Sequence, residues 1–441
     1  MAAIHSSVNL DDPNAIPVPP PDFDWKQHRK YVLFMMFITY FLNSVDRNII
    51  KILAEPIKAE FGLADWQLGL MTGFAFATFY NLVGLPTARF IDGGAVRRNI
   101  IAGGLALWSL ATALCGAAQN YTQLLIARGL VGVGEGTFGP SVVTLVSDYY
   151  GRSERARAIA TYLIGLPIAA LVGMTLGGWV ADHYGWRMAL VVVGLPGVLV
   201  ALIVRFTVKE PPRGLSDGKF VKIAKALPIG QVFRTMTKKK TVVYLLIAAA
   251  CASFPTVGMT AWYPPYLQRA FGMSLSELGA YWGIVTGVTG ALGSLGAGWL
   301  VDRYSAKHPR FFMIFPALAM IISFPFFVMA TLAGNFALAL VFLVVPATLN
   351  NSWIPAALAT TQGLAPMAMR ALLGMFVTFA ANIVGHGLSP PLIGLVSDLY
   401  GASMGPAAGL RWALITSATL YPTAAFFFWM ASRTVDNDLE K

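Results

Sequence analysis

Twelve long apolar stretches constrain the fold of this chain more than any other feature. They lie at approximately 31–54, 66–91, 99–118, 121–147, 156–180, 187–208, 241–268, 277–300, 311–331, 335–361, 370–397 and 408–431. Each is long enough to cross about 30 Å of hydrocarbon as an α-helix. The alternation typical of membrane β-strands is absent, and helices are the other way to satisfy the backbone within a bilayer. We therefore predict an all-α membrane protein with twelve transmembrane helices.

Composition agrees with this fold class and argues against several functions. The chain is 56% hydrophobic and 12% charged, whereas soluble domains are about 25% charged. Its two cysteines, Cys115 and Cys251, lie inside apolar runs, so the sequence offers neither a disulfide framework nor a cysteine metal site. Zinc-pair, nucleophile-elbow and nucleotide-binding motifs are missing. We therefore expect no enzyme activity, no cofactor and no metal, and no ATP-driven transport.

The distribution of lysine and arginine predicts how the chain lies in the membrane. The tails and even-numbered loops hold 25 of these residues and the opposite side holds 5, while Arg47 and Arg128 lie within spans. Because positively charged loops stay on the cytoplasmic side, both termini are predicted to be cytoplasmic, in a plasma or inner membrane. The net charge of +11 is explained by this orientation, so we expect no nucleic-acid partner.

The spans fall into two similar halves. GWVADHYG at 178–185 and GLVSDLYG at 394–401 match at an offset of 216 residues, and each ends the fifth span of its half. Such repeats indicate a transporter whose halves rock around a central site. The predicted regions are a disordered cytoplasmic tail, an N-terminal six-helix bundle, a basic cytoplasmic linker, a C-terminal six-helix bundle and a cytoplasmic tail, at 1–30, 31–208, 209–240, 241–432 and 433–441. Residues 220–227 of the linker could form an amphipathic helix on the membrane or a solvated segment.

The fourth span carries Arg128 and Glu135 in its apolar centre. A charge inside hydrocarbon is costly, so such side chains normally face a protein interior or a water-filled cavity. The two residues are seven apart, which is close to two helical turns, so they share one face. Glycines around them allow a neighbouring helix to approach closely. This stripe is either a working site or a buried ion pair that locks helices together.

Asp46 and Arg47 in the first span extend this charged pattern. Asp46 and Arg128 both lie roughly 10–12 Å below the outer surface, and Glu135 lies about 10 Å nearer the cytoplasm. An Asp46–Arg128 pair is therefore feasible, and Arg128 could be shared between the two carboxylates. Arg47 points about 100° away from Asp46, which leaves it free to meet a substrate anion or another helix.

The buried carboxylates suggest a coupling ion. A carboxylate whose proton affinity is raised by burial and lowered by an arginine can carry a proton. Sodium would require several hard oxygen ligands, and the sequence has no dense cluster of them. The alternative for Asp46 is a permanent salt bridge.

The second half has no acidic residue deep within a span. Its tenth and eleventh spans instead contain prolines, which free backbone carbonyls, together with Asn350, Asn351 and His386. These three side chains could contact a polar headgroup. For His386, a hydrogen bond between helices is an equal alternative.

One loop motif resembles the major facilitator signature GxLxDR. It reads Gly298-Trp299-Leu300-Val301-Asp302-Arg303, and an aspartate at this place can cap a helix and pair with loop arginines. The first-half copy departs from the signature, because two glycines follow Asp92 and the arginines come later. The predicted cytoplasmic gate consists of Asp92, Arg97, Arg98, Asp302 and Arg303.

Two further segments resemble the spinster family of major facilitator transporters. FLNSVDR at 41–47 is similar to the family's FLNYxDR in helix one, and ARGLVGVGE at 127–135 is similar to its helix-four segment. The resemblance implies a transporter of lysophospholipids or sphingoid phosphates, commonly coupled to protons. On this interpretation the protein is a monomer that works by alternating access. Proton coupling is assigned to Asp46, Glu135 and Arg128, and substrate contact to Arg47, Arg128, Asn350, Asn351 and His386.

Other functions stay open at this point. Within transport, the alternative is a proton-coupled exporter of drugs or small organic acids. A receptor or channel is disfavoured by the two-half repeat.

Overall fold

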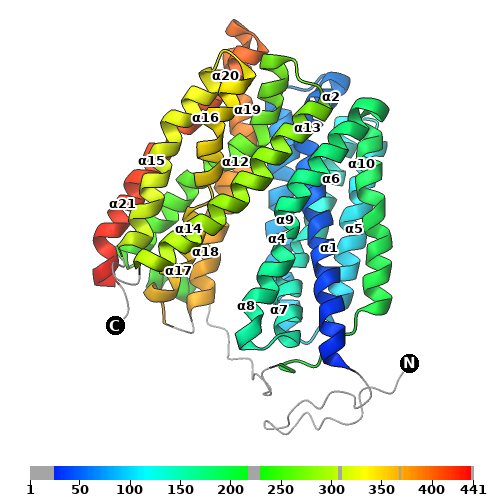
Figure 1. Ribbon diagram of the computed structural model, residues 1–441, viewed down its shortest axis with the longest axis vertical. Coiled ribbons are helices and arrows are strands. Elements are labelled where there is room, and N and C mark those ends of the chain that lie inside the picture. The colour runs from blue at the N-terminus through cyan, green and yellow to red at the C-terminus, as the bar shows by residue number, and fades with distance from the viewer. Residues whose placement is uncertain (1–23, 217–228, 306–309, 367–368, 439–441) are drawn as a thin grey trace.

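Every regular element in the described residues is helical (Figure 1). The computed structural model describes residues 24–216, 229–305, 310–366 and 369–438. The elements are α1 (Trp25–Ile52), α2 (Ala54–Phe61), α3 (Asp65–Gly69), η1 (Leu70–Phe74), α4 (Ala75–Asp92), α5 (Arg97–Ala117), α6 (Tyr121–Gly136), α7 (Phe138–Tyr149), α8 (Arg152–Leu163), α9 (Gly165–Ile168), η2 (Ala169–Gly173), α10 (Met174–Thr207), α11 (Ile229–Met236), α12 (Lys240–Phe271), α13 (Leu275–Ile284), η3 (Val285–Thr289), α14 (Gly290–Ser305), α15 (Phe311–Leu332), α16 (Phe336–Leu349), α17 (Trp353–Leu364), α18 (Arg370–Asn382), η5 (Ile383–Leu388), α19 (Ser389–Met404), α20 (Pro406–Ala418) and α21 (Leu420–Asp438).

Ten helical stretches among these residues are long and apolar enough to cross a membrane. One of them, 153–207, has 55 residues and is interrupted at Gly185, whose φ of 82° is left-handed. About 20 residues suffice for one crossing, so this stretch can hold two. Helix α1 is not among the ten, although it covers the predicted first span. The multi-pass helical membrane fold is therefore confirmed, and the count of twelve stays a prediction.

The helices form two groups, which Figure 1 shows side by side. We call 25–208 the N-terminal group and 229–438 the C-terminal group. Within them, α10 packs along α5, and α12 packs along α21. The start of α1 and the end of α21 lie at one end of the molecule, drawn at the bottom of Figure 1. Following the charge prediction, we name this the cytoplasmic end and the opposite one the outer end. Residues 1–23 of the predicted tail and 220–227 lie outside the described residues.

In the described part of the chain, four short π-helical segments lie where the two groups meet. Segment η1 contacts η5, and η2 contacts η3. Segments η1 and η3 begin 215 residues apart, and η2 and η5 begin 214 apart, close to the offset of the sequence repeat. Such segments are uncommon and occur frequently at functional sites. The repeat in sequence is thus matched by a repeat in local backbone structure.

Candidate functional site

A buried ion pair between α1 and α6 lies at the centre of the candidate site. The Arg47 Nη2 is 2.5 Å from the Glu135 Oε2, and its Nε is 3.0 Å from the same oxygen. The Glu135 side chain is fully buried, whereas the Arg47 side chain is 32% exposed. The guanidinium also lies over the rings of Phe76 and Tyr80, 5.0 and 5.1 Å from their centroids. One face of Arg47 is therefore neutralised, and part of it stays open to a ligand.

Close packing of α6 on α4 brings Glu135 into this position. A Cβ built on Gly132 would lie 2.5 Å from the Phe76 carbonyl oxygen, and one on Gly136 would lie 2.6 Å from that of Tyr80. Only glycine fits at such distances, because real Cβ atoms do not approach that closely. Gly132 and Gly136 therefore face α4, whereas Gly134 faces α5, where a Cβ would lie 2.7 Å from the Trp108 backbone nitrogen.

In this conformation Arg128 is not shared between two carboxylates, which the sequence had allowed. No ion pair joins Arg128 to a described carboxylate; its guanidinium lies 5.7 Å from the Phe76 ring centroid, and its Nε has no hydrogen-bond partner. Arg128 and Glu135 share a face but are separated by roughly 10 Å along the helix axis. Arg47 reaches Glu135 from α1 instead. Of the two contacts that the sequence left open for Arg47, a substrate anion or another helix, this conformation contains the one with another helix.

Asp46 is a buried carboxyl without a hydrogen-bond partner in the described structure. It is 1% exposed, and both of its carboxyl oxygens are unpaired. The Trp108 indole and the Thr112 hydroxyl on α5 face it without completing a hydrogen bond, and both are themselves unpaired. Arg128 and Glu135 are the charged residues that act on it electrostatically. The salt-bridge alternative for Asp46 is not what this conformation contains.

A small polar pocket of about 50 Å³ opens beside Arg47. Its lining comes from both helix groups and consists of Arg47, Phe76, Ala77, Tyr80, Asn81, Asn382 and His386. His386 is thus brought to the site from η5, as the sequence suggested. Asn81 and Asn382 were not among the predicted site residues, although a lone amide inside an apolar span was a readable signal.

A much larger cavity adjoins this pocket, and the two share Ala77 and Asn81. We call it the side cavity; its volume is about 910 Å³. Its lining is mostly apolar and comes from η1 and α4 of one group and from α18 and η5 of the other: Phe74, Ala77, Thr78, Asn81, Leu82, Pro86, Arg89, Phe90, Phe379, Ile383, Gly387 and Leu388. The polar pocket therefore forms a charged branch of an apolar cavity between the groups.

The structure does not bring Asn350 and Asn351 to either cavity. Asn350 is 1% exposed and donates a hydrogen bond from its Nδ2 to the Met259 sulfur at 3.5 Å. Asn351 is exposed. Both lie where α16 ends, and the prolines that flagged this region give no information about which way the side chains point.

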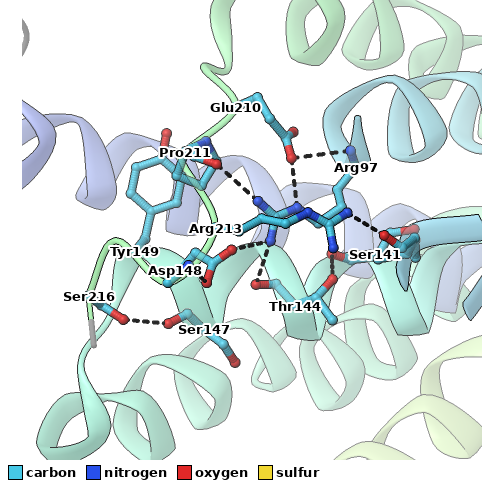
Figure 2. Close-up of polar contacts among 12 residues, drawn as sticks. Arg97, Ser141, Thr144, Ser147, Asp148, Tyr149, Glu210, Pro211, Arg213 and Ser216 are labelled. Atoms are coloured by element: carbon cyan, nitrogen blue, oxygen red, sulfur yellow. Dashed lines mark hydrogen bonds and ion pairs between the residues drawn. The ribbon is translucent and has the colours of Figure 1, made fainter. Parts of the chain in front are cut away.

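At the cytoplasmic end, Arg97 anchors the segment that follows α10 (Figure 2). Its Nε donates to the Glu210 Oε1 at 2.6 Å, its Nη2 donates to the Pro211 carbonyl at 3.1 Å, and its Nη1 pairs with Asp148. Arg98 uses its backbone N–H to bind the Glu210 Oε2 at 2.9 Å. All of these partners belong to the N-terminal group or to the segment that directly follows it. Arg97 and Arg98 therefore organise one group and do not bridge the two.

Among the described residues, no ion pair or hydrogen bond joins Arg303, another predicted gate residue, to the N-terminal group. Arg303 is exposed and lies over the Trp299 ring at 5.2 Å. The side chains of Asp92 and Asp302 lie outside what the structure describes.

At the outer end, the repeated aspartates join the two groups. Asp398 on α19 accepts hydrogen bonds from the backbone N–H groups of Asp65 and Trp66 at the start of α3, at 2.9 and 3.0 Å. Asp182 on α10 accepts from Leu275 and Ser276 at the start of α13, at 3.0 and 2.7 Å. A carboxylate at a helix N-terminus satisfies unpaired N–H groups and complements the helix dipole. Each motif thus caps a helix of the opposite group.

A buried arginine strengthens this outer contact. Arg269 at the end of α12 is 2.7 Å from the Glu55 Oε1 and 2.6 Å from the Asp65 Oδ1. Asp65 also accepts a hydrogen bond from the Ser397 hydroxyl at 2.7 Å. One cation of the C-terminal group therefore holds two carboxylates of the N-terminal group.

Comparison with known proteins gives a consistent set of relatives. A family model for the Major Facilitator Superfamily matches residues 36–386. An MFS-type efflux pump of Mycolicibacterium smegmatis is 30% identical over 399 residues, which cover 90% of this chain and 91% of that protein. Protein spinster homolog 1 of Xenopus tropicalis is 24% identical and covers 94% and 82% of the two chains. The crystal structure of a bacterial homolog of the human lysosomal transporter spinster, inward-facing and unoccupied, matches with a TM-score of 0.83 and 28% identity over 94% and 99% of the chains.

Proposed function

The chain is a spinster-like member of the Major Facilitator Superfamily, and from this premise we propose that it is a proton-coupled secondary transporter of an amphipathic, lipid-like anion. The twelve predicted spans then form two six-helix halves, with both termini in the cytoplasm. The substrate class is that of lysophospholipids and sphingoid phosphates.

The observation that carries this proposal is the joining of a charged pocket to an apolar cavity. Arg47 supplies a partly exposed guanidinium in the polar pocket, beside Asn81, Asn382 and His386. The side cavity offers about 910 Å³ of mostly apolar space next to it. Ligand sites are typically apolar with a few placed polar groups, and a cavity of this size holds a drug-sized molecule. An anionic headgroup at Arg47 with a chain in the side cavity uses both features.

The environment of Asp46 supports proton coupling. An ionised carboxylate buried without a partner is costly, and this conformation supplies Asp46 with none. The protonated carboxyl fits this environment, because its burial carries a much smaller penalty. In the opposite conformation, ionised Asp46 would hold Arg128, which has no ion-pair partner here. The proton would thus bias a two-state equilibrium, which requires only different affinities for the two states.

The conformation supports an inward-open assignment. The outer end is joined by contacts from both groups, whereas at the cytoplasmic end no ion pair among the described residues joins the two groups. Release of a substrate toward the cytoplasm, or loading from it, would occur in this state. Transport would then require the outer contacts to open and the cytoplasmic ends to meet.

Uptake by reconstituted vesicles under an imposed pH gradient tests the function. We expect a single-chain anionic amphiphile such as dodecyl phosphate to accumulate only when the gradient is present. Arg47→Gln should abolish accumulation, while Arg205→Gln, at an exposed position on α10 outside both cavities, should not. Equal uptake with and without the gradient would refute proton coupling.

The second candidate is a proton-coupled exporter of drugs or small organic acids. The similarity to the mycobacterial efflux pump favours it, and a largely apolar cavity also suits a neutral drug. The two functions differ in what Arg47 does. Transport of a cationic or neutral dye that survives Arg47→Gln, together with no uptake of dodecyl phosphate, would favour the exporter.

A further inference from the structure

We propose that Arg89 is the loading contact for the anionic headgroup of a single-chain amphiphile that enters the side cavity from the cytoplasmic leaflet. In this role Arg89 would determine selectivity for anionic over neutral headgroups. The inference rests on the proposed function, because it requires the side cavity to hold an amphiphile. Its new element is a second headgroup position, separate from the one at Arg47.

Arg89 lines the side cavity at the depth where lipid headgroups lie. It is three residues from the end of α4, so it lies within about 5 Å of the cytoplasmic end of that helix. Phe74, fifteen residues earlier, lines the same cavity roughly 22 Å deeper. The hydrocarbon core of a bilayer is about 30 Å thick. The cavity therefore runs from the cytoplasmic interface past the middle of the membrane, as the chain of an inner-leaflet amphiphile would.

The charge of Arg89 is available to a ligand. Its side chain is exposed, and among the described residues its guanidinium has no hydrogen-bond or ion-pair partner. Among the described lining residues of the two cavities, Arg47 and Arg89 are the arginines, and none is acidic. An arginine binds a phosphate through charge-assisted hydrogen bonds that can be bidentate. The linings therefore favour an anion over a cation.

The rest of the lining suits an alkyl chain that arrives from the bilayer. Leu82 and Phe90 on α4 are 64% and 69% exposed, and Phe379 and Ile383 on the facing helix are 42% and 40% exposed. These four side chains form an apolar wall on each side of the cavity, and they stay accessible from outside the protein. An amphiphile can then place its headgroup at Arg89 while its chain lies along this wall.

The polar pocket would receive the headgroup next. It joins the side cavity at Ala77 and Asn81, and Asn81 is eight residues from Arg89 along α4. The headgroup would therefore move about 12 Å deeper to reach Arg47. Arg89 would thus bind the headgroup during loading, and Arg47 would bind it at the inner position.

Binding to the purified full-length protein tests the inference. Dissociation constants are measured for dodecyl phosphate, for dodecyl maltoside with the same chain and a neutral headgroup, and for glycerol 1-phosphate with no long chain. Arg89→Gln should weaken dodecyl phosphate binding about 10-fold, the factor expected from one charge-assisted hydrogen bond. Dodecyl maltoside should bind as before. Arg89→Lys should recover most of the affinity. The control is Arg205→Gln, which removes an arginine near the cytoplasmic end of α10 and should leave the affinity unchanged.

A dodecyl phosphate that carries a diazirine at its chain end should crosslink to residues 74–82 or 379–388. Equal weakening of the phosphate and the maltoside by Arg89→Gln, or no weakening of the phosphate, would overturn the inference. Glycerol 1-phosphate binding as tightly as dodecyl phosphate would do the same, since the ligand would then be a soluble anion. If wild type accumulates dodecyl phosphate but Arg89→Gln binds it normally, only this inference fails. If wild type neither binds nor accumulates it, the proposed function fails.

Discussion

The two ends of the molecule use similar charged residues for different purposes. At the outer end, Asp182, Asp398 and Arg269 bind residues of the opposite helix group. At the cytoplasmic end, Arg97 binds Asp148 and Glu210 near its own group. An ion pair can favour one conformational state only when it exists in that state and is broken in the other. On the proposed mechanism the outer contacts therefore favour the state that this structure holds, whereas the cytoplasmic contacts hold together parts of one half.

The outer end also packs more closely than charge alone requires. A Cβ on Gly178 would lie 2.2 Å from the Leu275 carbonyl oxygen, and one on Gly279 would lie 2.2 Å from that of Met174. Glycines on α10 and α13 thus let the two backbones touch, so that Asp182 can reach the first N–H groups of α13. The N–H groups at the start of α13 are hydrogen-bonded to Asp182 only while the two helix groups are together. The outer contact is therefore specific to these helices and can be broken when the helix groups separate.

The largest effect should come from Arg269→Gln. Removing one member of a buried ion pair typically costs about 3–5 kcal/mol, because the partner charge stays buried. Here Glu55 and Asp65 would both lose the cation that they share, and Asp65 would keep only its ion pair with Lys58. We expect the population to move strongly toward the outward-open state. Spin labels at 184 and 403, one in each group at the outer end, should show a longer distance, and an unchanged distribution would contradict this role.

Removal of the repeated caps should have a smaller effect at each site. Loss of a helix cap costs about 1–2 kcal/mol, which is roughly a 5- to 30-fold change in the ratio of states. Asp182→Ala and Asp398→Ala should each lengthen the same distance, and their effects should add, because they cap different helices. The matched control is Asp436→Ala, whose partner Arg310 lies in the same group. If Asp436→Ala changed the distance between the labels and the two cap variants did not, the cytoplasmic contacts and not the outer ones would set the state.

Glu210→Gln should leave the distance between groups unchanged. The substitution removes the negative charge of the Glu210 carboxylate, to which Arg97 and Arg98 donate hydrogen bonds. A hydrogen bond to a charged group is worth about 1.5–3 kcal/mol. Since Arg97 keeps its ion pair with Asp148, we expect the free energy of unfolding to fall by an amount in the lower half of that range. A change in the distance between 184 and 403 would mean that the cytoplasmic anchor also sets the state.

Sequence patterns predicted the helical membrane fold and the family, because apolar length and local motifs carry that information directly. They also indicated that Asp46, Arg128 and Glu135 are buried. They did not give the partner of Glu135, because helical periodicity places residues on a face without fixing which neighbouring helix supplies the counter-charge. The repeat that contains Asp182 and Asp398 was visible, but its role depends on backbone groups of distant helices. The side cavity depends on how the groups pack, which no local pattern encodes.

The measurement that tests the account most directly compares two activities of Asp46→Asn in reconstituted vesicles. One is accumulation of dodecyl phosphate driven by a pH gradient, and the other is exchange of labelled for unlabelled substrate without a gradient. Asparagine resembles the protonated carboxyl in shape but cannot release a proton, so substrate exchange should continue while driven accumulation is lost. Full gradient-driven accumulation by Asp46→Asn would contradict the account, because Asp46 would then have no part in coupling.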